Sequence, residues 1–204
     1  MIIKPICPYS FGANTYALIS DDKAFVVDPC ASAEAIINAV RDEGAHIIGI
    51  LLTHGHFDHT VAVDTLRAAT SAPAYIHEND ADMLTDGKKD AFFTFYGKEN
   101  KHAPADKLLK GGDVLTIGKE SINVIHTPGH TSGCVCFDCG DFLVTGDTLF
   151  AQSIGRCDLP SSNEDEMRYS LQLLRTLDRN ITIYPGHAEP AKLGHALDNA
   201  AFYL

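Results

Sequence analysis

The ten residues from 51 to 60, LLTHGHFDHT, constrain this chain more than any other segment. Three imidazoles and one carboxylate fall within six residues here, directly after the apolar run 47–52. A continuous apolar run of this kind predicts a strand that is buried on both faces. Side chains two residues apart in extended backbone project to the same side, so His54 and His56 can converge on one ion.

Asp58 and His59 follow where the chain turns into a helix, which we expect to run from about Asp58 to Ala69. Their side chains can therefore face a second point close to the first. A lone histidine is more often a packing residue than a ligand. Four polar groups at one strand exit would destabilise a core, because buried imidazoles and carboxylates need partners. The segment therefore indicates a metal site.

Three later positions repeat this setting, each with a polar side chain just after an apolar strand. They are His130 after 122–125, Asp147 after 142–144 and His187 after 181–184. Strand ends that gather at one sheet edge hold their loops in fixed positions. Five histidines and two aspartates suffice for two divalent metal ions with one bridging carboxylate. Ligands without thiolate suit zinc, iron or manganese, and zinc is our first choice.

The order of apolar strands and helical segments predicts an α/β architecture. Strands fall in two blocks, each closed by helices, which indicates two packed sheets with helices outside. The predicted strands are 2–7, 15–19, 25–27, 47–52, 74–76, 114–117, 122–125, 135–137, 142–144 and 181–184. The predicted helices run from the cap Ser32 to about Glu43, over 58–69, around 167–177 and near the C-terminus. Between 79 and 110 the pattern is ambiguous.

Composition excludes several classes of protein. The 204 residues fit one domain. Sixteen Lys and Arg against 27 Asp and Glu give a net charge of −11, so nucleic acid is not an expected partner. No apolar stretch reaches the roughly 18 residues of a membrane span, and no export signal precedes the first strand. We therefore expect a cytoplasmic protein that acts on a small molecule.

The six cysteines, at positions 7, 30, 134, 136, 139 and 157, are expected to be reduced thiols rather than three disulfides. The cluster 134–139 lacks a second pair at matching distance, so a separate zinc knuckle is not expected.

The pattern His54-x-His56-x-Asp58-His59 resembles the metallo-β-lactamase superfamily of metallohydrolases, as do the three later ligands in their order. The resemblance covers nearly the whole chain and implies an αββα sandwich of two mixed β-sheets flanked by helices. By position, the resemblance implies that a first metal is held by His54, His56 and His130. A second metal would be held by Asp58, His59 and His187, and Asp147 would bridge the two.

Within that superfamily, TPGHT around His130 and GDTLF around Asp147 are most similar to glyoxalase II, the hydroxyacylglutathione hydrolases. The loop 153–160 resembles that of short, single-domain members. Only 17 residues follow His187, so we expect one domain over 1–204 without the C-terminal glutathione-binding domain. Antibiotic-cleaving lactamases commonly carry Cys in place of the bridging Asp and are exported, so Asp147 favours a different role.

The chemistry expected of such a site is hydrolysis. Two cations make a shared water a strong nucleophile near neutral pH. We expect attack on the carbonyl of a small thioester or ester, such as S-lactoylglutathione, with a thiolate expelled. Asp58 is the expected catalytic residue, which positions the water and takes its proton; a role as ligand only stays open.

Two further features bear on the substrate. Arg156 lies where the family places a basic residue for the thiol carrier, so it is the expected substrate-binding residue, with a surface salt bridge as the equal alternative. The aromatic cluster 92–96 could form the wall of an acyl pocket, but we favour an anchor for a helix or a homodimer contact.

Other activities stay open. A persulfide dioxygenase-like enzyme with one iron shares the Gly-Arg-x-Asp sequence at 155–158, and a lactone or ester hydrolase is a further option. A metal-free binding module is the remaining class. The other histidines have no ligand-like setting, although His126 could support the metal ligands. They are His46, His77, His102, His126 and His195.

Overall fold

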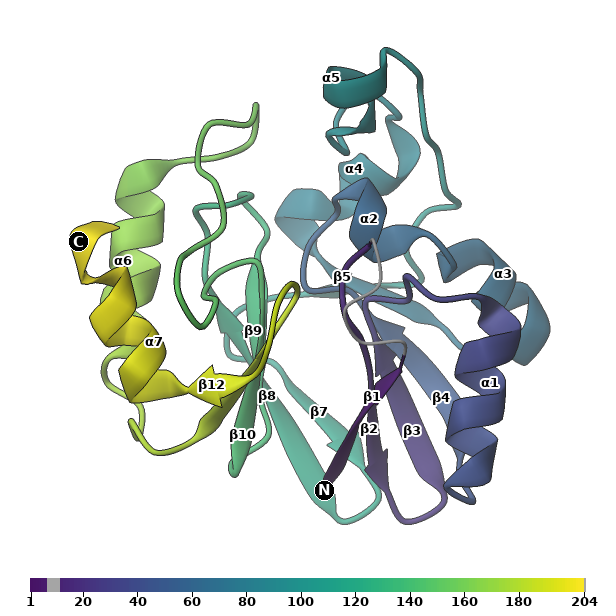
Figure 1. The fold of residues 1–204 in the computed structure, drawn as a ribbon. Helices are drawn as coiled ribbons and strands as arrows, with labels where there is room; N and C mark the ends of the chain where they lie inside the picture. Colours follow the sequence, from purple (N-terminus) through teal and green to yellow (C-terminus); the bar gives the residue numbers. More distant parts are fainter. Residues whose placement is uncertain (7–11, 204) are drawn as a thin grey trace.

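The computed structural model of this protein describes residues 1–6 and 12–203, in which two six-stranded sheets pack against each other (Figure 1). The first sheet contains β1 to β6 in chain order, and the second has the order β12-β11-β10-β9-β8-β7. Both sheets are mixed. Strands β3 to β6 run parallel in the first and β10 runs parallel to β11 in the second, whereas the other neighbours are antiparallel.

The strands lie close to their predicted positions. Those of the first sheet are β1 (Ile2–Ile6), β2 (Thr15–Ser20), β3 (Lys23–Val27), β4 (His46–Leu51), β5 (Ala74–His77) and β6 (Lys107–Leu109). Those of the second are β7 (Val114–Ile117), β8 (Glu120–His126), β9 (Val135–Asp138), β10 (Phe142–Gly146), β11 (Thr182–Pro185) and β12 (Ala191–Lys192). The predicted end of the first strand at Cys7 lies outside the described residues.

Alternation along the strands divides the apolar side chains among three cores. In β2, Leu18 faces the second sheet and meets Phe137 of β9, whereas Ala17 faces the opposite way. Helices α1 (Ala33–Asp42) and α3 (Val63–Thr70) cover the outer face of the first sheet. Helices α6 (Glu164–Leu174) and α7 (Leu193–Asn199) cover the outer face of the second (Figure 1). The result is the predicted αββα sandwich.

The predicted helix start and stop signals of α1 are confirmed. The Ser32 hydroxyl accepts a hydrogen bond from the amide of Ala35, which satisfies one of the free donors of the first turn. Gly44 follows the helix with a φ of +74°, a conformation that glycine adopts without strain.

The predicted helix 58–69 is wrong as a single helix. The segment forms α2 (Phe57–Thr60) and α3, because the amide of Ala62 donates to the carbonyl of Pro29 at 2.8 Å instead of to a helical partner. The sequence pattern also missed β6 and β12, which are too short to show periodicity. The ambiguous region contains most of η1 (Glu78–Asp80), together with α4 (Ala81–Thr85) and α5 (Phe92–Tyr96), and the described residues end with η2 (Ala200–Tyr203).

The topology brings several strand ends to one side of the sandwich. Strands β3, β4 and β5 are parallel, so their carboxyl ends meet at one edge of the first sheet. Strands β8 and β10 both run antiparallel to β9, and β11 is parallel to β10, so these three also point one way. Loops at such an edge are held in place by the strands that precede them. Among the described segments, no helix has the length and apolar character needed to cross a membrane.

We expect Phe137→Ala to lower the free energy of unfolding by about 3–5 kcal/mol, because it leaves a cavity in the core between the sheets. Phe137 is fully buried there. Val114→Ala is the control, since Val114 of β7 is 58% exposed and should contribute less than about 0.5 kcal/mol. Urea denaturation measures both variants, and equal losses would contradict the packing described.

Candidate metal centre

The structure brings together all seven polar side chains that the sequence singled out at the strand ends. Their ligating atoms form three overlapping groups, and within each group the atoms lie within 4.8 Å of one another. The groups are His54, His56 and His130; His54, His59 and Asp147; and Asp58, His59 and His187. Two neighbouring points of convergence therefore exist, as expected for a pair of cations.

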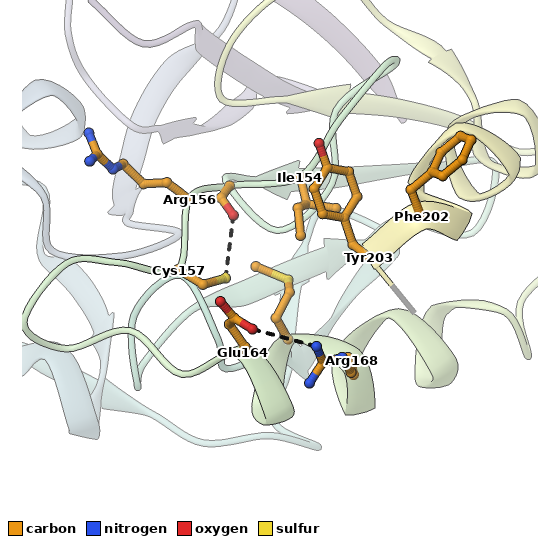
Figure 2. A pocket seen from close by; sticks show the side chains of 9 residues that line it. Ile154, Arg156, Cys157, Glu164, Arg168, Phe202 and Tyr203 are labelled. Atoms are coloured by element: carbon orange, nitrogen blue, oxygen red, sulfur yellow. Dashed lines mark hydrogen bonds and ion pairs between the residues drawn. The ribbon is translucent and has the colours of Figure 1, made fainter.

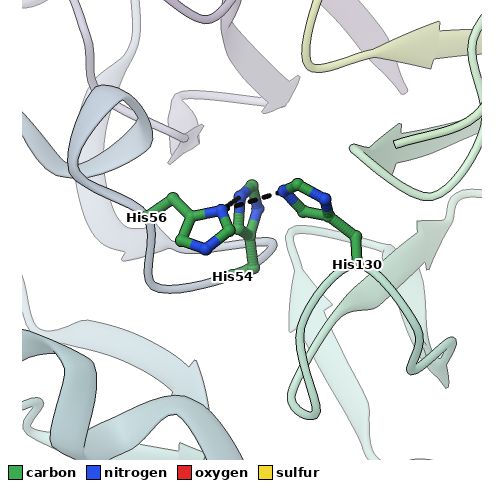
Figure 3. Close-up of side chains that lie close together, drawn as sticks. All are labelled: His54, His56 and His130. Carbon is green, nitrogen blue, oxygen red and sulfur yellow. Dashed lines mark hydrogen bonds between the residues drawn. The ribbon is translucent and has the colours of Figure 1, made fainter. Parts of the chain in front are cut away.

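The first group contains three imidazoles that point toward one another (Figure 3). Nδ1 of His56 lies 3.1 Å from Nε2 of His54 and 2.9 Å from Nε2 of His130. All three rings are buried. Zinc binds imidazole nitrogen at about 2.0–2.1 Å, so nitrogens at this spacing can contact one ion.

The outer nitrogens of three rings already have partners, which turns the inner nitrogens toward the centre. Nδ1 of His54 donates to the Thr53 hydroxyl at 3.1 Å, since that hydroxyl donates to the carboxylate of Asp28. Nδ1 of His130 donates to the carbonyl of Arg156 at 2.8 Å. Nδ1 of His59 donates to Asp28 at 2.9 Å. The Nε2 atom of each ring therefore faces the centre. Burial would lower the pKa of His59, but Asp147 and Asp28 raise it well above its usual value, so a metal would displace a proton there.

Asp147 lies between the two points of convergence. Its Oδ2 atom is 3.6 Å from Nε2 of His130 and 3.4 Å from Nε2 of His187, and its Oδ1 atom is 3.3 Å from Nε2 of His59. The buried atoms Asp147 Oδ1 and His59 Nε2 have no hydrogen-bond partner. Because buried polar atoms are costly without partners, this pair fits a bound cation.

A glycine makes room for this carboxylate. A Cβ atom at Gly186 would lie 2.2 Å from Oδ1 of Asp147, which no side chain could tolerate. The turn Pro185-Gly186-His187 can therefore approach Asp147 only because its middle residue is glycine.

The titratable groups of the centre are strongly perturbed. Burial and the neighbouring His130 lower the pKa of His56 to about 3, so the ring is neutral. Burial would raise the pKa of Asp58, but His59 and His187 lower it to about 2. Burial alone would lower the pKa of His187, yet Asp147 and Asp58 raise it to about 9. Strongly perturbed groups in one cleft mark a functional site.

Two buried aspartates that support the ligand loops were missed by the sequence reasoning. Asp28 accepts hydrogen bonds from the amide of Thr53 at 2.8 Å, from the Thr53 hydroxyl at 2.6 Å and from His59. Asp28 directly follows β3. The pattern of a polar residue just after a strand, which we call the strand-end rule and which identified Asp147, could therefore have found it.

The second is Asp80, which joins the two loops of the first group. Its carboxylate accepts from the amides of Gly55 and Gly133 at 3.1 and 2.7 Å, and from the Thr131 hydroxyl at 2.6 Å. Burial raises the pKa of Asp80, which these donors oppose. Gly55 separates His54 from His56, and Thr131 follows His130, so one carboxylate holds both loops. Asp80 ends a 3-10 turn after β5, where no sequence pattern marked it.

A cavity of about 330 Å³ opens onto the centre. It lies between α5 and the loop that follows β10. Its lining is His56, Phe57, Asp58, Ala91, Phe95, His130, Asp147, Phe150, Gly155, Arg156, Leu159 and His187. Five of the seven converging residues therefore face this space.

Arg156 lines this cavity, but its guanidinium is already paired. Its Nε and Nη2 atoms donate to the Asp158 carboxylate at 2.6 and 2.7 Å, and the side chain is 52% exposed. Its Cζ atom lies 5.7 Å from the ring centroid of Phe95. The structure is thus compatible with both alternatives for Arg156, because the side chain forms a salt bridge and also lines the cavity at the centre.

A larger cavity, of about 490 Å³, lies on the other side of the loop that carries Ile154 to Cys157 (Figure 2). Arg156 extends away from it, and Glu164 pairs with Arg168 at 3.5 Å in its wall. None of the seven converging residues lines this cavity. It is therefore not where the metal chemistry occurs.

His126 supports the His130 loop rather than the metal ligands themselves. Its Nε2 atom donates to the carbonyl of Ser132 at 2.9 Å, and its ring stacks on His77 at a centroid distance of 4.1 Å. The cysteines Cys30, Cys134, Cys136, Cys139 and Cys157 are free, and Cys7 lies outside the described residues. Burial raises the pKa of Cys136 to about 11, so this thiol stays protonated.

Comparisons with known proteins agree with this site. The family model described as "Metallo-beta-lactamase superfamily" matches residues 9–187. The probable metallo-hydrolase YqgX of Bacillus subtilis (strain 168) is 35% identical over 178 residues, which cover 86% of this chain and 84% of that protein.

Solved structures are similar over nearly the whole chain. BLEG-1, described as a B3 metallo-beta-lactamase, has a TM-score of 0.90 and 35% identity, and covers 99% of both chains. TTHA1623, solved in a di-iron-bound form, has a TM-score of 0.83 and 28% identity, and covers 99% of this chain and 100% of its own.

We expect Asp80→Ala to lower the free energy of unfolding by about 3 kcal/mol or more and to weaken metal retention, because three buried donors lose a charged acceptor. Asp82→Ala is the control, since Asp82 is an exposed residue of α4 paired with Lys89, and its loss should cost less than about 1 kcal/mol. Urea denaturation and elemental analysis measure the two effects. Equal stability and equal metal content in both variants would contradict the role of Asp80.

Metal loading should release a proton from His187, because an imidazole must be neutral to bind a cation and the pKa of this ring is about 9 in the metal-free protein. The apparent affinity for zinc should therefore rise from pH 7 toward pH 9. Titration calorimetry at pH 7.5, in buffers with different ionisation enthalpies, should count more released protons for the wild type than for His187→Ala. Identical proton release would show that His187 is not a ligand.

Proposed function

This chain belongs to the metallo-beta-lactamase superfamily, and we propose that it is a two-metal hydrolase that cleaves small thioesters in the manner of glyoxalase II. Its relatives are named metallo-hydrolases, and the His and Asp cluster gives it the residues of a metal site. We propose zinc as the metal; the di-iron form of TTHA1623 makes iron an equal candidate for testing.

The position of Asp147 carries the proposal. Its carboxylate lies within 3.6 Å of a nitrogen from each side of the centre, while one of its oxygens and the facing His59 nitrogen, 3.3 Å apart, are buried without a hydrogen bond. A carboxylate between two groups of imidazoles, of which His187 must first release its proton, suits two cations that would share it as a ligand. His54, His56 and His130 would hold one ion, and Asp58, His59 and His187 the other.

When bound, such a pair of ions supplies Lewis acidity that activates water and polarises a carbonyl oxygen. Asp58 orients the attacking water by accepting its hydrogen bond, because its low pKa keeps the carboxylate ionised beside His187; the same low pKa makes it a weak base for the proton itself. Asp28 and Asp80 hold the ligand loops in place while charge develops on the substrate. The departing thiolate needs little protonation, since thiols are fairly acidic.

The choice of thioesters rests on sequence similarity to glyoxalase II around His130 and Asp147. In this proposal the substrate is a small molecule, S-lactoylglutathione or a related thioester, and neither nucleic acid nor a membrane is a partner.

β-Lactam hydrolysis is a second candidate. The observation that favours it is the similarity to BLEG-1, which is described as a B3 metallo-beta-lactamase and is 35% identical over nearly the full length. A β-lactam ring also has a carbonyl that the same centre could attack. A side-by-side assay of thioesters, lactones, β-lactams and glutathione persulfide with oxygen distinguishes these reactions on protein of measured metal content.

We expect Asp147→Ala to abolish thioester hydrolysis and to reduce the bound metal, because it removes the carboxylate shared by both sides of the centre. Asp141→Ala is the control, since Asp141 is exposed in the turn before β10, the strand that carries Asp147 at its other end. Steady-state hydrolysis and elemental analysis measure the outcome. Retained activity with normal metal content would refute the bridging role, and oxygen consumption with persulfide by a one-iron protein would refute the hydrolase.

A further inference from the structure

We propose that the cavity beside the metal centre contains an acyl-binding subsite that selects apolar acyl groups of about six carbons over short polar ones such as lactoyl. This inference rests on the proposed hydrolase and narrows its substrate from S-lactoylglutathione, the first example, to related thioesters with longer apolar acyl groups. Phe57, Phe95, Phe150 and Leu159 form the subsite, which we call the acyl wall.

The acyl wall and the metal centre face the same space. The polar part of the cavity lining comes from the converging residues, and the apolar part comes from three separate segments of chain. Phe57 comes from α2, Phe95 from α5, and Phe150 and Leu159 from the loop after β10. A carbonyl carbon held at the metal centre would therefore have its acyl chain directed against apolar surface.

Aromatic rings reach the metal ligands themselves. The ring of Phe150 lies 6.0 Å from that of His187, measured between centroids. Phe57 stands between His56 and Asp58 in the sequence, and its ring lies 6.3 Å from that of Phe95. The acyl wall thus has two members beside the metal ligands, Phe57 and Phe150, and one on α5, Phe95.

The start of α5 is held in place by hydrogen bonds to Asp90. The amide of Phe57 donates to the carbonyl of Asp90 at 3.1 Å, and the buried Asp90 carboxylate accepts from the amide of Phe92 and the side chain of Asn100. Ala91, between Asp90 and Phe92 in the sequence, has a φ of +67°, a conformation that a non-glycine residue adopts at some cost in free energy. The surrounding contacts therefore hold Phe95 at the cavity.

The aromatic cluster of α5 divides into two roles. Phe92 and Tyr96 pack on Phe57 at 5.2 and 5.9 Å and anchor the helix, as we expected of this cluster. Phe95 is 49% exposed and lines the cavity, so much of its ring has no protein partner. Covering such a ring with an apolar group is favourable in proportion to the area removed from water.

The charges around the cavity disfavour an anionic acyl group. Asp58 and Asp147 belong to the metal centre, and the Nε and Nη2 atoms of Arg156 donate to Asp158, so the apolar part of the lining offers an anionic acyl group no free cationic partner. The cavity of about 330 Å³ has room for about ten groups of water size, at about 30 Å³ each. A six-carbon acyl chain, the sulfur atom and the attacking water fit within that space.

The test uses the metal-loaded enzyme and thioesters of N-acetylcysteamine, an uncharged carrier, with acetyl, butyryl, hexanoyl and lactoyl groups. We expect kcat/KM to rise two- to fourfold for each methylene, up to hexanoyl. Phe95→Ala should lower the hexanoyl-to-acetyl ratio at least about fivefold. Phe93→Ala is the matched control on the same helix, since Phe93 is 40% exposed, contacts Lys88 and lies outside the cavity lining.

A binding measurement separates this proposal from the proposed function. Amide analogues of the same series resist hydrolysis, and calorimetry should show the hexanoyl amide to bind more tightly than the acetyl amide, in a manner that depends on Phe95. If no thioester is cleaved but this dependence holds, the subsite stands and the reaction is wrong. Equal kcat/KM for all chains, or a ratio that Phe95→Ala leaves unchanged, would overturn the acyl wall.

Discussion

The structure depends on how five imidazoles and two carboxylates are held together inside one edge of a sandwich. Groups of this kind repel or lose solvation when they are buried, and a buried atom without a partner is costly. The protein occupies the outer nitrogens of His54, His59 and His130 with oxygen acceptors. The inner atoms, including Asp147 Oδ1, are left facing one another, which a cation would stabilise.

The strand-end rule predicted much of this from the sequence. Local patterning identified the sandwich, ten of the twelve described strands and all seven converging residues, because each polar residue follows a strand that is visible as an apolar run. The same rule, applied to β3, would have given Asp28. The break between α2 and α3 was not predictable in this way, because it depends on a hydrogen bond from Ala62 to Pro29, far away in the chain.

The roles of Asp80 and of the aromatic cluster 92–96 could not be predicted from local sequence patterns. Asp80 acts through donors at Gly55, Thr131 and Gly133, which only the folded chain brings to it. The sequence could not tell which rings of 92–96 anchor α5 and which face a substrate, because both kinds are aromatic and adjacent. Phe57 lies near all three of the rings Phe92, Phe95 and Tyr96, but of these three Phe95 alone lines the cavity. The metal-binding residues can therefore be recognised from local sequence patterns. The side chains that would select a substrate depend on contacts between distant segments of the chain.

Crystals of the zinc-loaded protein, measured by anomalous diffraction at the zinc edge, test the central claim most directly. The account predicts two peaks, one against the inner nitrogens of His54, His56 and His130 and one against Asp58, His59 and His187, with the Asp147 carboxylate between them. A single peak, or two peaks that leave Asp147 without contact to either ion, would contradict a two-metal centre built on that residue.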